Sequence, residues 1–532
     1  MSEHSGHDVE AQVPPSPMAS SATLTTTRAG EEHTLKEKNF NLVRHLDPDV
    51  NIVDWDGPDD PENPFNWPVK KKWIITAVAL FATLTSLVNG TIITVAHEAI
   101  NEQFNVSDAT FPNSYWPVAS WTLGGAFTMM TVLPLMEDFG IRWPFLITYG
   151  TFLCFILPQA LAHNFATLIV TRFFAGGCVS ILANTVSAII CDVWEGDTGR
   201  TIPMSLFVTA YLVGSTVGPV IGAAIFQHLS WRWIGYIQLI FNGAFFPLYF
   251  FVIQETRGPV ILRKRAQRIR AETGEKAFTR EEMHDIPLLQ VLVTSIKRPM
   301  YMLCTEYVVF SFTLWSAFSV GTVYLFTQSV EQVFAGLYGW SAVQCGYVQA
   351  AIVIGEVLGL SGSLVSSRLY FASAARNKEN PGEPIPEARL YVSIFGGLVG
   401  VAGGMLVYGW TSYPHVPWIA PAIGLGMVGF GINVIVMAIA DYVTDCYSMY
   451  AASAVGVIGF GENVLSAFLP LSAQSMYTNL GYHWASTLLA FLGFLLACAP
   501  IVLLIWGRKI RSRSPFISQA SYEKKVAVVE QE

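Results

Sequence analysis

The sequence predicts an all-α membrane protein with twelve transmembrane helices arranged in two six-helix halves. Hydrophobic residues make up 52% of the 532 residues and charged residues only 13%, which are too few charges to cover a soluble globule. The apolar residues fall into twelve runs, each long enough to cross a hydrocarbon core of about 30 Å. Lys and Arg gather in the connections on one predicted side of these runs, which fixes their orientation.

The twelve runs are each close to the roughly 20 residues that a membrane-spanning helix needs. The tight junction at His163-Asn164 separates the third run from the fourth, and Gly and Pro residues interrupt the fifth. We expect spans at 73–96, 113–136, 143–163, 165–190, 201–226, 231–253, 301–327, 341–366, 388–410, 416–440, 446–473 and 483–507.

The spans divide the chain into five regions. A cytosolic N-terminal tail (1–72) precedes an N-terminal six-helix half (73–253), and a basic cytosolic loop (254–300) leads to a C-terminal six-helix half (301–507) and a cytosolic tail (508–532). The first 40 residues contain no apolar stretch and are rich in Ser, Thr, Pro and Glu. We therefore expect disorder there, and no cleavable signal peptide.

The positions of Lys and Arg predict which side of the membrane each loop faces, because basic loops are retained in the cytosol during insertion. Lys70, Lys71 and Lys72 precede the first span, ten basic residues run from Arg257 to Arg298, and Arg508, Lys509, Arg511 and Arg513 directly follow the last span. The connections on the other side contain no Lys or Arg: 97–112, 227–230, 328–340, 411–415 and 474–482. Both termini are therefore expected in the cytosol, and the net charge of −8 does not indicate a nucleic-acid partner.

Several kinds of site are not expected from this sequence. The seven Cys lie in or at the ends of spans without paired spacing, so we predict no disulfide and no metal site. The chain has no P-loop, no G-x-S-x-G elbow and no paired His ligands, which predicts neither an enzyme nor a cofactor. Asn105-Val106-Ser107 forms a glycosylation sequon on the predicted outer side, although its loop is short.

The fifth span contains the pattern G-x-x-x-G-P-x-x-G, formed by Gly214, Gly218, Pro219 and Gly222. Glycines at helical spacing allow a neighbouring helix to approach closely, and proline bends a helix by removing one backbone hydrogen bond. The pattern resembles the antiporter motif of the drug:proton exchangers of the major facilitator superfamily. A general small-residue packing face is the alternative interpretation.

The fourth span contains RFFAGG, from Arg172 to Gly177, which resembles the R-x-x-x-G motif of the same superfamily. An arginine inside the bilayer costs at least about 3 kcal/mol, so it needs a carboxylate, a water-filled cavity or backbone carbonyls as a partner. The resemblance implies a role in coupling. Alternatively, the side chain snorkels to the outer headgroups.

The loop between the second and third spans reads LPLMEDFGIR and resembles the superfamily's cytosolic gate only in part. Gly140 and Arg142 match the family pattern and Glu137 replaces an aspartate, whereas Leu133 and Asp138 stand where glycine and arginine are expected. This departure leaves the fold unaffected but puts the salt bridge of the gate in doubt.

Further strings are similar to the fungal branch of twelve-span drug:proton antiporters, which includes multidrug, polyamine and secondary-metabolite exporters. The strings are DWDGPDDPENPFNW, SWRWIGYIQ, PEARLY, GWTS, YVTDCY and IRSRSPF, and together they extend from residue 54 to residue 516. Most have structural roles in the branch. The resemblance implies a transporter but names no cargo.

Two acidic residues lie in the middle of spans. Glu356 is in the eighth span, and Glu462, followed by Asn463, occupies the eleventh where many relatives carry an arginine. Burial in a medium of low dielectric favours the neutral acid, so each side chain is suited to hold a proton at neutral pH and to release it when water or a cationic substrate arrives. A permanently protonated, hydrogen-bonded acid is the alternative, and Glu306 has an equally plausible structural role at a helix end.

Polar and aromatic residues inside the spans are candidates for lining a substrate cavity, because large pockets of this composition suit amphipathic ligands. Aromatic residues at span ends more often form interfacial belts. The cavity candidates are Asn89, Tyr211, Trp315, Tyr324, Asn433 and Asn463.

Taken together, these features predict a monomeric proton antiporter of the plasma membrane that exports small amphipathic molecules, either toxicants or a secondary metabolite. Its partners would be that small molecule, protons and membrane lipids, and Arg172, Glu356 and Glu462 would couple proton movement to transport. A dedicated carrier of an organic acid or another single metabolite, with Arg172 binding a carboxylate, is the alternative. A nutrient sensor ranks last, because the cytosolic segments are short for a signalling domain. The sequence leaves open the cargo and the choice between vacuolar and plasma membrane.

Overall fold

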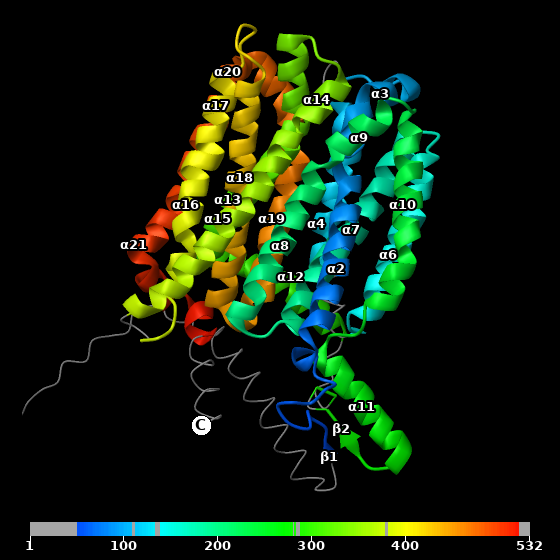
Figure 1. The fold of residues 1–532 in the computed structure, drawn as a ribbon, viewed down its shortest axis with the longest axis vertical. Coiled ribbons are helices and arrows are strands. Elements are labelled where there is room, and N and C mark those ends of the chain that lie inside the picture. Colours follow the sequence, from blue (N-terminus) through cyan, green and yellow to red (C-terminus); the bar gives the residue numbers. More distant parts are fainter. Residues whose placement is uncertain are drawn as a thin grey trace, which may run out of the picture. The chain divides into compact units, whose positions relative to one another are not determined.

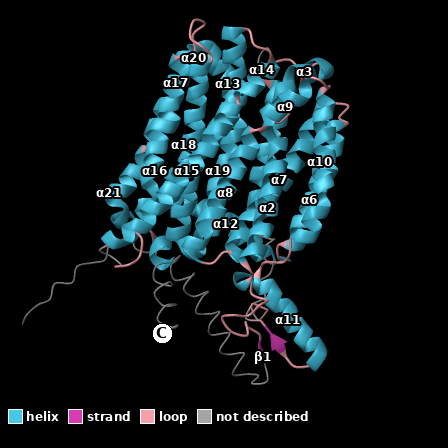
Figure 2. Cartoon of the chain, viewed as in Figure 1, coloured by secondary structure: helices cyan, strands magenta, loops and turns pink. Residues whose placement is uncertain are grey.

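A computed structural model describes residues 51–108, 112–132, 139–279, 281–282, 288–377 and 381–520. Nearly all regular structure within these ranges is helical (Figure 2), which confirms the predicted all-α class. The predicted gate residue Glu137 and the first 50 residues, predicted to be disordered in large part, lie outside the described residues. The chain divides into a helical bundle, Trp55–Ile261 and Ile286–Glu532, and a small unit within Met1–Asp54 and Leu262–Asp285.

Within the described residues, the predicted N-terminal half, 73–253, corresponds to eight helices of the bundle. Most of them run along the long direction of the bundle in Figure 1. They are α2 (Val69–Thr91), α3 (His97–Phe104), α4 (Trp116–Thr131), α6 (Arg142–Ala160), α7 (Phe165–Val193), α8 (Gly196–Thr216), α9 (Gly218–Phe226) and α10 (Trp231–Val252), with 3-10 turns at Pro64–Asn66, Thr94–Ala96 and Asn113–Tyr115.

The C-terminal half, residues 301–507, begins within α12 and contains one stretch of π-helix, η6. Its elements are α12 (Leu288–Thr305), α13 (Tyr307–Tyr338), α14 (Ala342–Val348), α15 (Ala350–Ser373), α16 (Tyr391–Phe395), η6 (Gly396–Gly403), α17 (Gly404–Trp410), α18 (Ile419–Tyr447), α19 (Ala451–Phe468), α20 (Ala473–Leu496) and α21 (Cys498–Arg513), with 3-10 turns at Ala374–Arg376, Pro386–Leu390, Ser448–Tyr450 and Pro470–Ser472.

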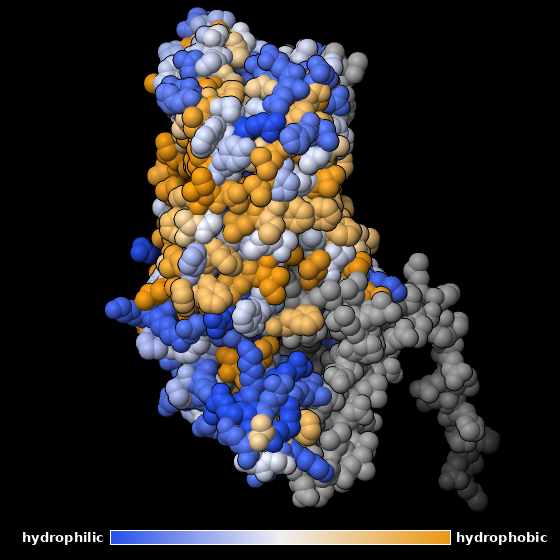
Figure 3. Space-filling model, turned by 90° about the vertical axis from the view of Figure 1, so that its right-hand side faces the viewer, coloured by the Kyte–Doolittle hydropathy of each residue, from blue (hydrophilic) through white to orange (hydrophobic). Residues whose placement is uncertain are grey.

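Ten helical stretches within the described residues are long and apolar enough to cross a membrane. One of them, Ala451–Arg513, runs for 63 residues and covers most of the last two predicted spans. The second predicted span corresponds to α4, a shorter helix of 16 residues. Each of the twelve predicted spans coincides with a described helix, but the count of twelve stays a prediction. The face of the bundle seen in Figure 3 carries a broad band of apolar side chains, as expected for a surface that contacts lipid. Exposed hydrophobic residues on α6 and α10 include Ile147, Ile240 and Phe251.

Several predicted boundaries differ from the structure. The seventh span was expected at 301–327, whereas α13 begins after Glu306 and continues to Tyr338, where Gly339 adopts a left-handed conformation with φ 65°. The polar residues after 327 suggested a loop, but Gln and Glu are good helix formers. Likewise, the predicted connection 97–112 contains the helix α3.

Glycines bring helices into close contact in the same way in both halves. A Cβ built on Gly124 of α4 would lie 1.9 Å from the carbonyl oxygen of Phe173 on α7, and one built on Gly355 of α15 would lie 1.9 Å from the carbonyl oxygen of Gly426 on α18. Neither position has room for a larger residue. These backbone contacts hold α4 against α7 and α15 against α18, as small residues do in membrane helix pairs.

The small unit combines a two-stranded parallel sheet with most of α11 (Gly258–Thr273). Strands β1 (Asn51–Ile52) and β2 (Ala277–Phe278) pair directly. The guanidinium of Arg270 donates to both carboxylate oxygens of Glu282, each at 3.0 Å. This contact holds the pKa of Glu282 below its usual value, so the ion pair persists at neutral pH.

The close α15–α18 contact predicts that Gly355→Ala destabilises the bundle, because the added methyl group meets rigid backbone. We expect a loss of about 1–3 kcal/mol, the usual cost of overpacking, measured as a lower thermal unfolding midpoint of the purified protein. Gly456→Ala is the matched control, since a Cβ at this position of α19 meets nothing within 4 Å. Equal midpoints for the two variants would contradict the close contact.

Candidate functional site

The antiporter-like motif of the fifth span lies at a break between α8 and α9. Each of its glycines faces the end of α2 or the turn that follows it. A Cβ on Gly214 would lie 2.9 Å from the Leu84 carbonyl oxygen, one on Gly218 would lie 2.1 Å from Thr91 Oγ1, and one on Gly222 would lie 2.3 Å from the Ile92 carbonyl oxygen. The close helix approach expected from the glycines is therefore present along the whole motif.

Pro219 explains the break. It has no backbone N–H, so the carbonyl of Ser215, four residues earlier, loses the hydrogen bond that a regular helix would give it. The hydroxyl of Thr91 donates to this carbonyl at 2.6 Å. A side chain of α2 therefore satisfies the group that the proline leaves free and fixes the break against α2.

The other side of the motif contacts the C-terminal half through Glu356 of α15. Thr216 Oγ1, at the end of α8, donates to Glu356 Oε2 at 2.6 Å. The Glu356 side chain is completely buried, and its Oε1 has no hydrogen-bond partner among the described residues. Gly346 of α14 also packs against the motif: a Cβ built on Gly346 would lie 2.9 Å from the Pro219 carbonyl oxygen. The motif thus lies between α2 of one half and α14 and α15 of the other.

Glu462 of α19 also faces the boundary between the halves. Ser316 of α13 donates to its carboxylate, and Tyr211 of α8 and Tyr324 of α13 are near enough to interact with it electrostatically. The neighbouring Asn463 donates to the Gly459 carbonyl at 2.9 Å. The side-chain oxygen of Asn463 lies 2.6 Å from a Cβ built on Gly125 of α4. Asn463 therefore packs against α4 of the N-terminal half.

Arg172 of α7 is completely buried and does not snorkel. Its guanidinium donates to the carbonyl of Pro117 at 2.5 Å and to the carbonyl of Asn89 at 3.1 Å, and it also donates to the carbonyl of Gly90. The ring of Trp121 lies 5.4 Å from the guanidinium carbon. Of the three partners considered from the sequence, backbone carbonyls are the ones present, and they tie α7 to α2 and α4.

The remaining cavity candidates separate into two groups. Asn433 of α18 donates to Thr209 of α8 at 2.9 Å, so it joins Tyr211 and Tyr324 at the boundary between the halves. Two other candidates lie inside single halves. Asn89 of α2 donates to Gln238 and Gln159 within the N-terminal half. Trp315 of α13 is 1% exposed, and its ring lies 3.1 Å from a Cβ built on Gly397 of η6 in the C-terminal half.

In the described part of the predicted gate, the carboxylate of Glu255 caps the start of α6. Gly140 adopts φ +83°, and a Cβ on it would lie 2.5 Å from a carboxylate oxygen of Glu255. Glu255 accepts hydrogen bonds from the backbone N–H of Ile141 at 2.9 Å and of Arg142 at 3.4 Å. Glycine is therefore required at residue 140 by both conformation and space. The sequence reasoning missed Glu255, which follows the sixth span.

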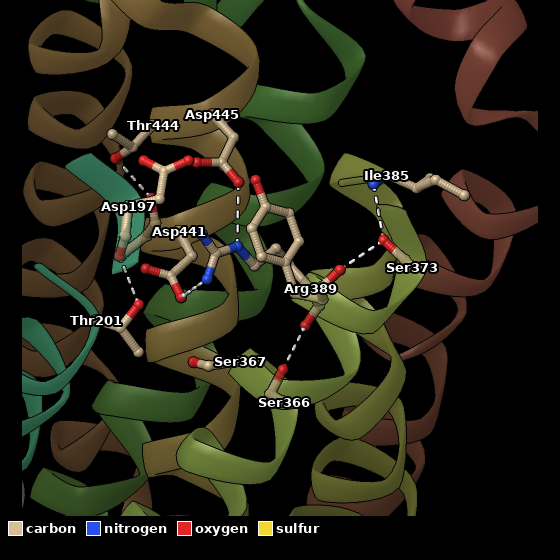
Figure 4. Close-up of polar contacts among 12 residues, drawn as sticks. Asp197, Thr201, Ser366, Ser367, Ser373, Ile385, Arg389, Asp441, Thr444 and Asp445 are labelled. Carbon is tan, nitrogen blue, oxygen red and sulfur yellow. Dashed lines mark hydrogen bonds and ion pairs between the residues drawn. The ribbon is translucent and has the colours of Figure 1, made fainter. Parts of the chain in front are cut away.

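A charged cluster missed by the sequence reasoning lies at the end of the bundle where α2 and α6 begin, which we call the basic end. Arg389 donates to Asp441 and to Asp445 of α18, each at 3.1 Å, and Tyr370 of α15 stacks 3.5 Å from its guanidinium carbon. Figure 4 shows Asp197, from the start of α8 in the N-terminal half, beside this cluster. Charged groups of both halves thus meet at the basic end.

This cluster explains why branch-typical strings far apart in the chain are charged. Arg389 of PEARLY binds Asp445 of YVTDCY, and Glu387 of PEARLY binds Arg511 of the closing string. Glu306 accepts hydrogen bonds from Tyr447 at 3.1 Å and from Ser514 at 2.7 Å. The sequence does show that opposite charges recur in these strings, and this pattern could have suggested ion pairs. It does not show which charge binds which.

The sequon residue Asn105 ends α3 with φ 52°, a left-handed conformation that Asn tolerates better than most residues. It is exposed. Glycosylation at this position stays a prediction.

The hydrogen bond from Thr91 to the Ser215 carbonyl predicts that Thr91→Val destabilises the protein. Valine keeps the shape but leaves a buried carbonyl without a donor, so we expect a loss of about 1–3 kcal/mol in thermal unfolding. Thr151→Val is the control, because the Thr151 hydroxyl donates to the Ile147 carbonyl of its own helix. An effect no larger than that of the control would mean that the Ser215 carbonyl is satisfied in another way.

The Arg389 cluster predicts that Arg389→Met leaves two carboxylates without their cation. We expect a loss of about 3–5 kcal/mol, seen as a lower unfolding midpoint and reduced yield, and partial recovery when Asp441→Asn and Asp445→Asn are added. Arg368→Met, at an exposed position of α15, is the control. Failure of the added substitutions to recover stability would show that the arginine acts by packing alone.

Comparisons with known proteins agree with the fold and with these strings. The sequence model of the Major Facilitator Superfamily matches residues 78–452. The MFS-type transporter acdC of Aspergillus candidus is 32% identical, with 90% of this chain and 92% of the relative aligned. A citrinin biosynthesis cluster MFS transporter of Monascus ruber is 32% identical over 88% of this chain and 93% of its own length. The multidrug transporter FLU1 of Candida albicans is 31% identical over 88% of this chain and 76% of its own length.

A solved structure shares the fold. The human organic anion transporter MFSD10 aligns with a TM-score of 0.54 at 16% sequence identity, covering 82% of this chain and all of that one. The match of the superfamily model over most of the sequence, together with relatives above 30% identity along nearly their whole length, is decisive for the family. The chain belongs to the major facilitator superfamily and is a multi-pass membrane transporter rather than an enzyme.

Proposed function

We propose that the protein is a proton-coupled exporter of small amphipathic molecules in the plasma membrane, with its basic end in the cytosol. The observation that carries this proposal is the position of Glu356, a completely buried acid that contacts the antiporter-like motif through Thr216. The names of relatives support export of this kind of cargo, since they include the FLU1 multidrug transporter and the efflux pump atB of Aspergillus terreus.

Glu356 links a proton to the contact between the halves. A neutral acid is tolerated in a packed, low-dielectric boundary, whereas a carboxylate needs water or a cation. When the halves separate at one end, water reaches the boundary and the acid loses its proton. When they close again, the acid must regain a proton or be met by a cationic cargo, so that proton and cargo alternate on one site.

Glu462 extends this exchange toward the cargo. It lies near Tyr211 and Tyr324, and Asn433 reaches α8 from α18. These groups combine aromatic surface with a few hydrogen-bonding atoms, the composition expected for an amphipathic ligand. Arg172 is a positioning residue in this scheme, because it holds α7 to α2 and α4 beside Tyr324.

The arrangement of Arg172 favours this proposal over a dedicated organic-acid carrier. That alternative requires Arg172 to bind a carboxylate, but three of its five N–H groups already donate to backbone carbonyls. The two candidates differ in charge preference. Cells lacking the protein should retain cationic or neutral amphipathic compounds, and retention of anionic metabolites alone would favour the alternative.

The role of the two acids predicts that Glu356→Gln and Glu462→Gln each reduce proton-driven transport by at least about tenfold, a typical share for a group that transfers a proton. The measurement is accumulation of the amphipathic dye rhodamine 6G by proteoliposomes with an imposed pH gradient. Glutamine keeps shape and hydrogen bonding, so dye exchange without a gradient should persist.

Glu272→Gln, at an exposed position of α11, is the matched control for these variants. Full gradient-driven transport by both Glu356→Gln and Glu462→Gln, or wild-type transport that ignores the gradient, would exclude the mechanism.

A further inference from the structure

A second cluster of ionisable groups lies at the end of the bundle opposite the basic end, where α3 and α14 are found in Figure 1. His97 and Glu98 begin α3, and Glu331 lies on α13. Each offers one ring nitrogen or carboxylate oxygen, and these three atoms lie within 4.8 Å of one another. His97 Nδ1 lies 3.5 Å from an oxygen of Glu331. Elements far apart in the sequence therefore bring one imidazole and two carboxylates together.

The cluster lines a cavity of about 260 Å³ between α3, the start of α4 and α13. Gln328 lines the same cavity, three residues before Glu331 and hence on the same face of α13. Its amide oxygen is buried and has no hydrogen-bond partner among the described residues. A buried oxygen without a donor costs free energy, and a cation in the cavity would relieve that cost.

We propose that His97, Glu98 and Glu331 bind a divalent transition-metal ion, for which Zn²⁺ is the best match. Zn²⁺ binds imidazole nitrogen and carboxylate oxygen, and an open zinc site has three protein ligands with a fourth position left for water, so one imidazole and two carboxylates supply the required number and types of ligand. Ca²⁺ and Mg²⁺ prefer oxygen ligands alone. Tetrahedral bonds of about 2.0–2.1 Å place ligand atoms roughly 3.3 Å apart, so side-chain rotations bring the three atoms into position. In that rotation the His97 ring leaves the Thr94 carbonyl oxygen, which lies 3.0 Å from Nδ1.

The ion would join the two halves. His97 and Glu98 belong to the N-terminal half and Glu331 to the C-terminal half, so a shared ion holds their ends together and keeps this end of the bundle closed. The site does not depend on the proposed export function, because it uses none of the residues assigned to proton coupling or cargo.

The test is isothermal titration of ZnCl₂ alone into the full-length protein, purified through a tag without histidine and treated with chelator. We expect one site, weakened at least about tenfold by His97→Gln, Glu98→Gln or Glu331→Gln, a loss in the range seen when metal sites are perturbed. Glu102→Gln in the same helix and His163→Gln are matched controls. All variants are compared in a His4→Gln/His7→Gln background, because these two tail histidines offer a competing site.

Hydrogen–deuterium exchange tests whether the ion bridges the halves. Zn²⁺ should slow exchange in both 93–104 and 324–338 in the wild type and in neither segment after Glu331→Gln. Absence of Zn²⁺ binding, or binding unchanged by all three substitutions, would overturn the site. Binding that depends on His97 and Glu98 but not on Glu331 would overturn the bridge. Glu98 is exposed, so its variant remains informative if the other two fail to fold.

Discussion

The contact between a buried acid and a broken helix organises the boundary between the two halves. Thr216 ends α8 one residue before the break, donates to Glu356 of the other half, and lies on the helix whose freed carbonyl is satisfied by Thr91. Three helices from both halves therefore depend on the same short segment. Because Glu356 is completely buried at this boundary, a change in its charge alters the free energy of the packing directly. In the proposed mechanism, this dependence is the physical basis for coupling a proton to a movement of helices.

Arg172 supports this boundary from within one half. Among the described residues, the buried Arg172 guanidinium has three backbone carbonyls from α2 and α4 in the place of a counter-ion. Carbonyl dipoles stabilise the cation without cancelling its charge. The arginine thus positions the two helices that carry Asn89, Gly90 and Pro117, and it leaves a positive field near Tyr324 on the opposite side of the boundary.

Much of the fold was predictable from the sequence, because span length, the placement of Lys and Arg and the glycine-proline motif each follow from local chemistry. Helix α13 extends past its predicted end and the predicted connection 97–112 contains α3, since polar residues beyond the hydrocarbon region still form helix. The partners of Glu356, Arg172 and Arg389 were not predictable. Each is bound to residues more than 50 positions away, and only tertiary structure decides which helix face meets which.

The junction of the last string with the rest of the C-terminal half has a consequence for the evolution of this group. Arg511 binds Glu387, and Ser514 shares Glu306 with Tyr447, so the end of the chain fastens three earlier segments at one place. A chimaera that takes this end from a relative must bring along compatible acids at residues 306 and 387. Recombination within the branch is therefore constrained at the closing string IRSRSPF.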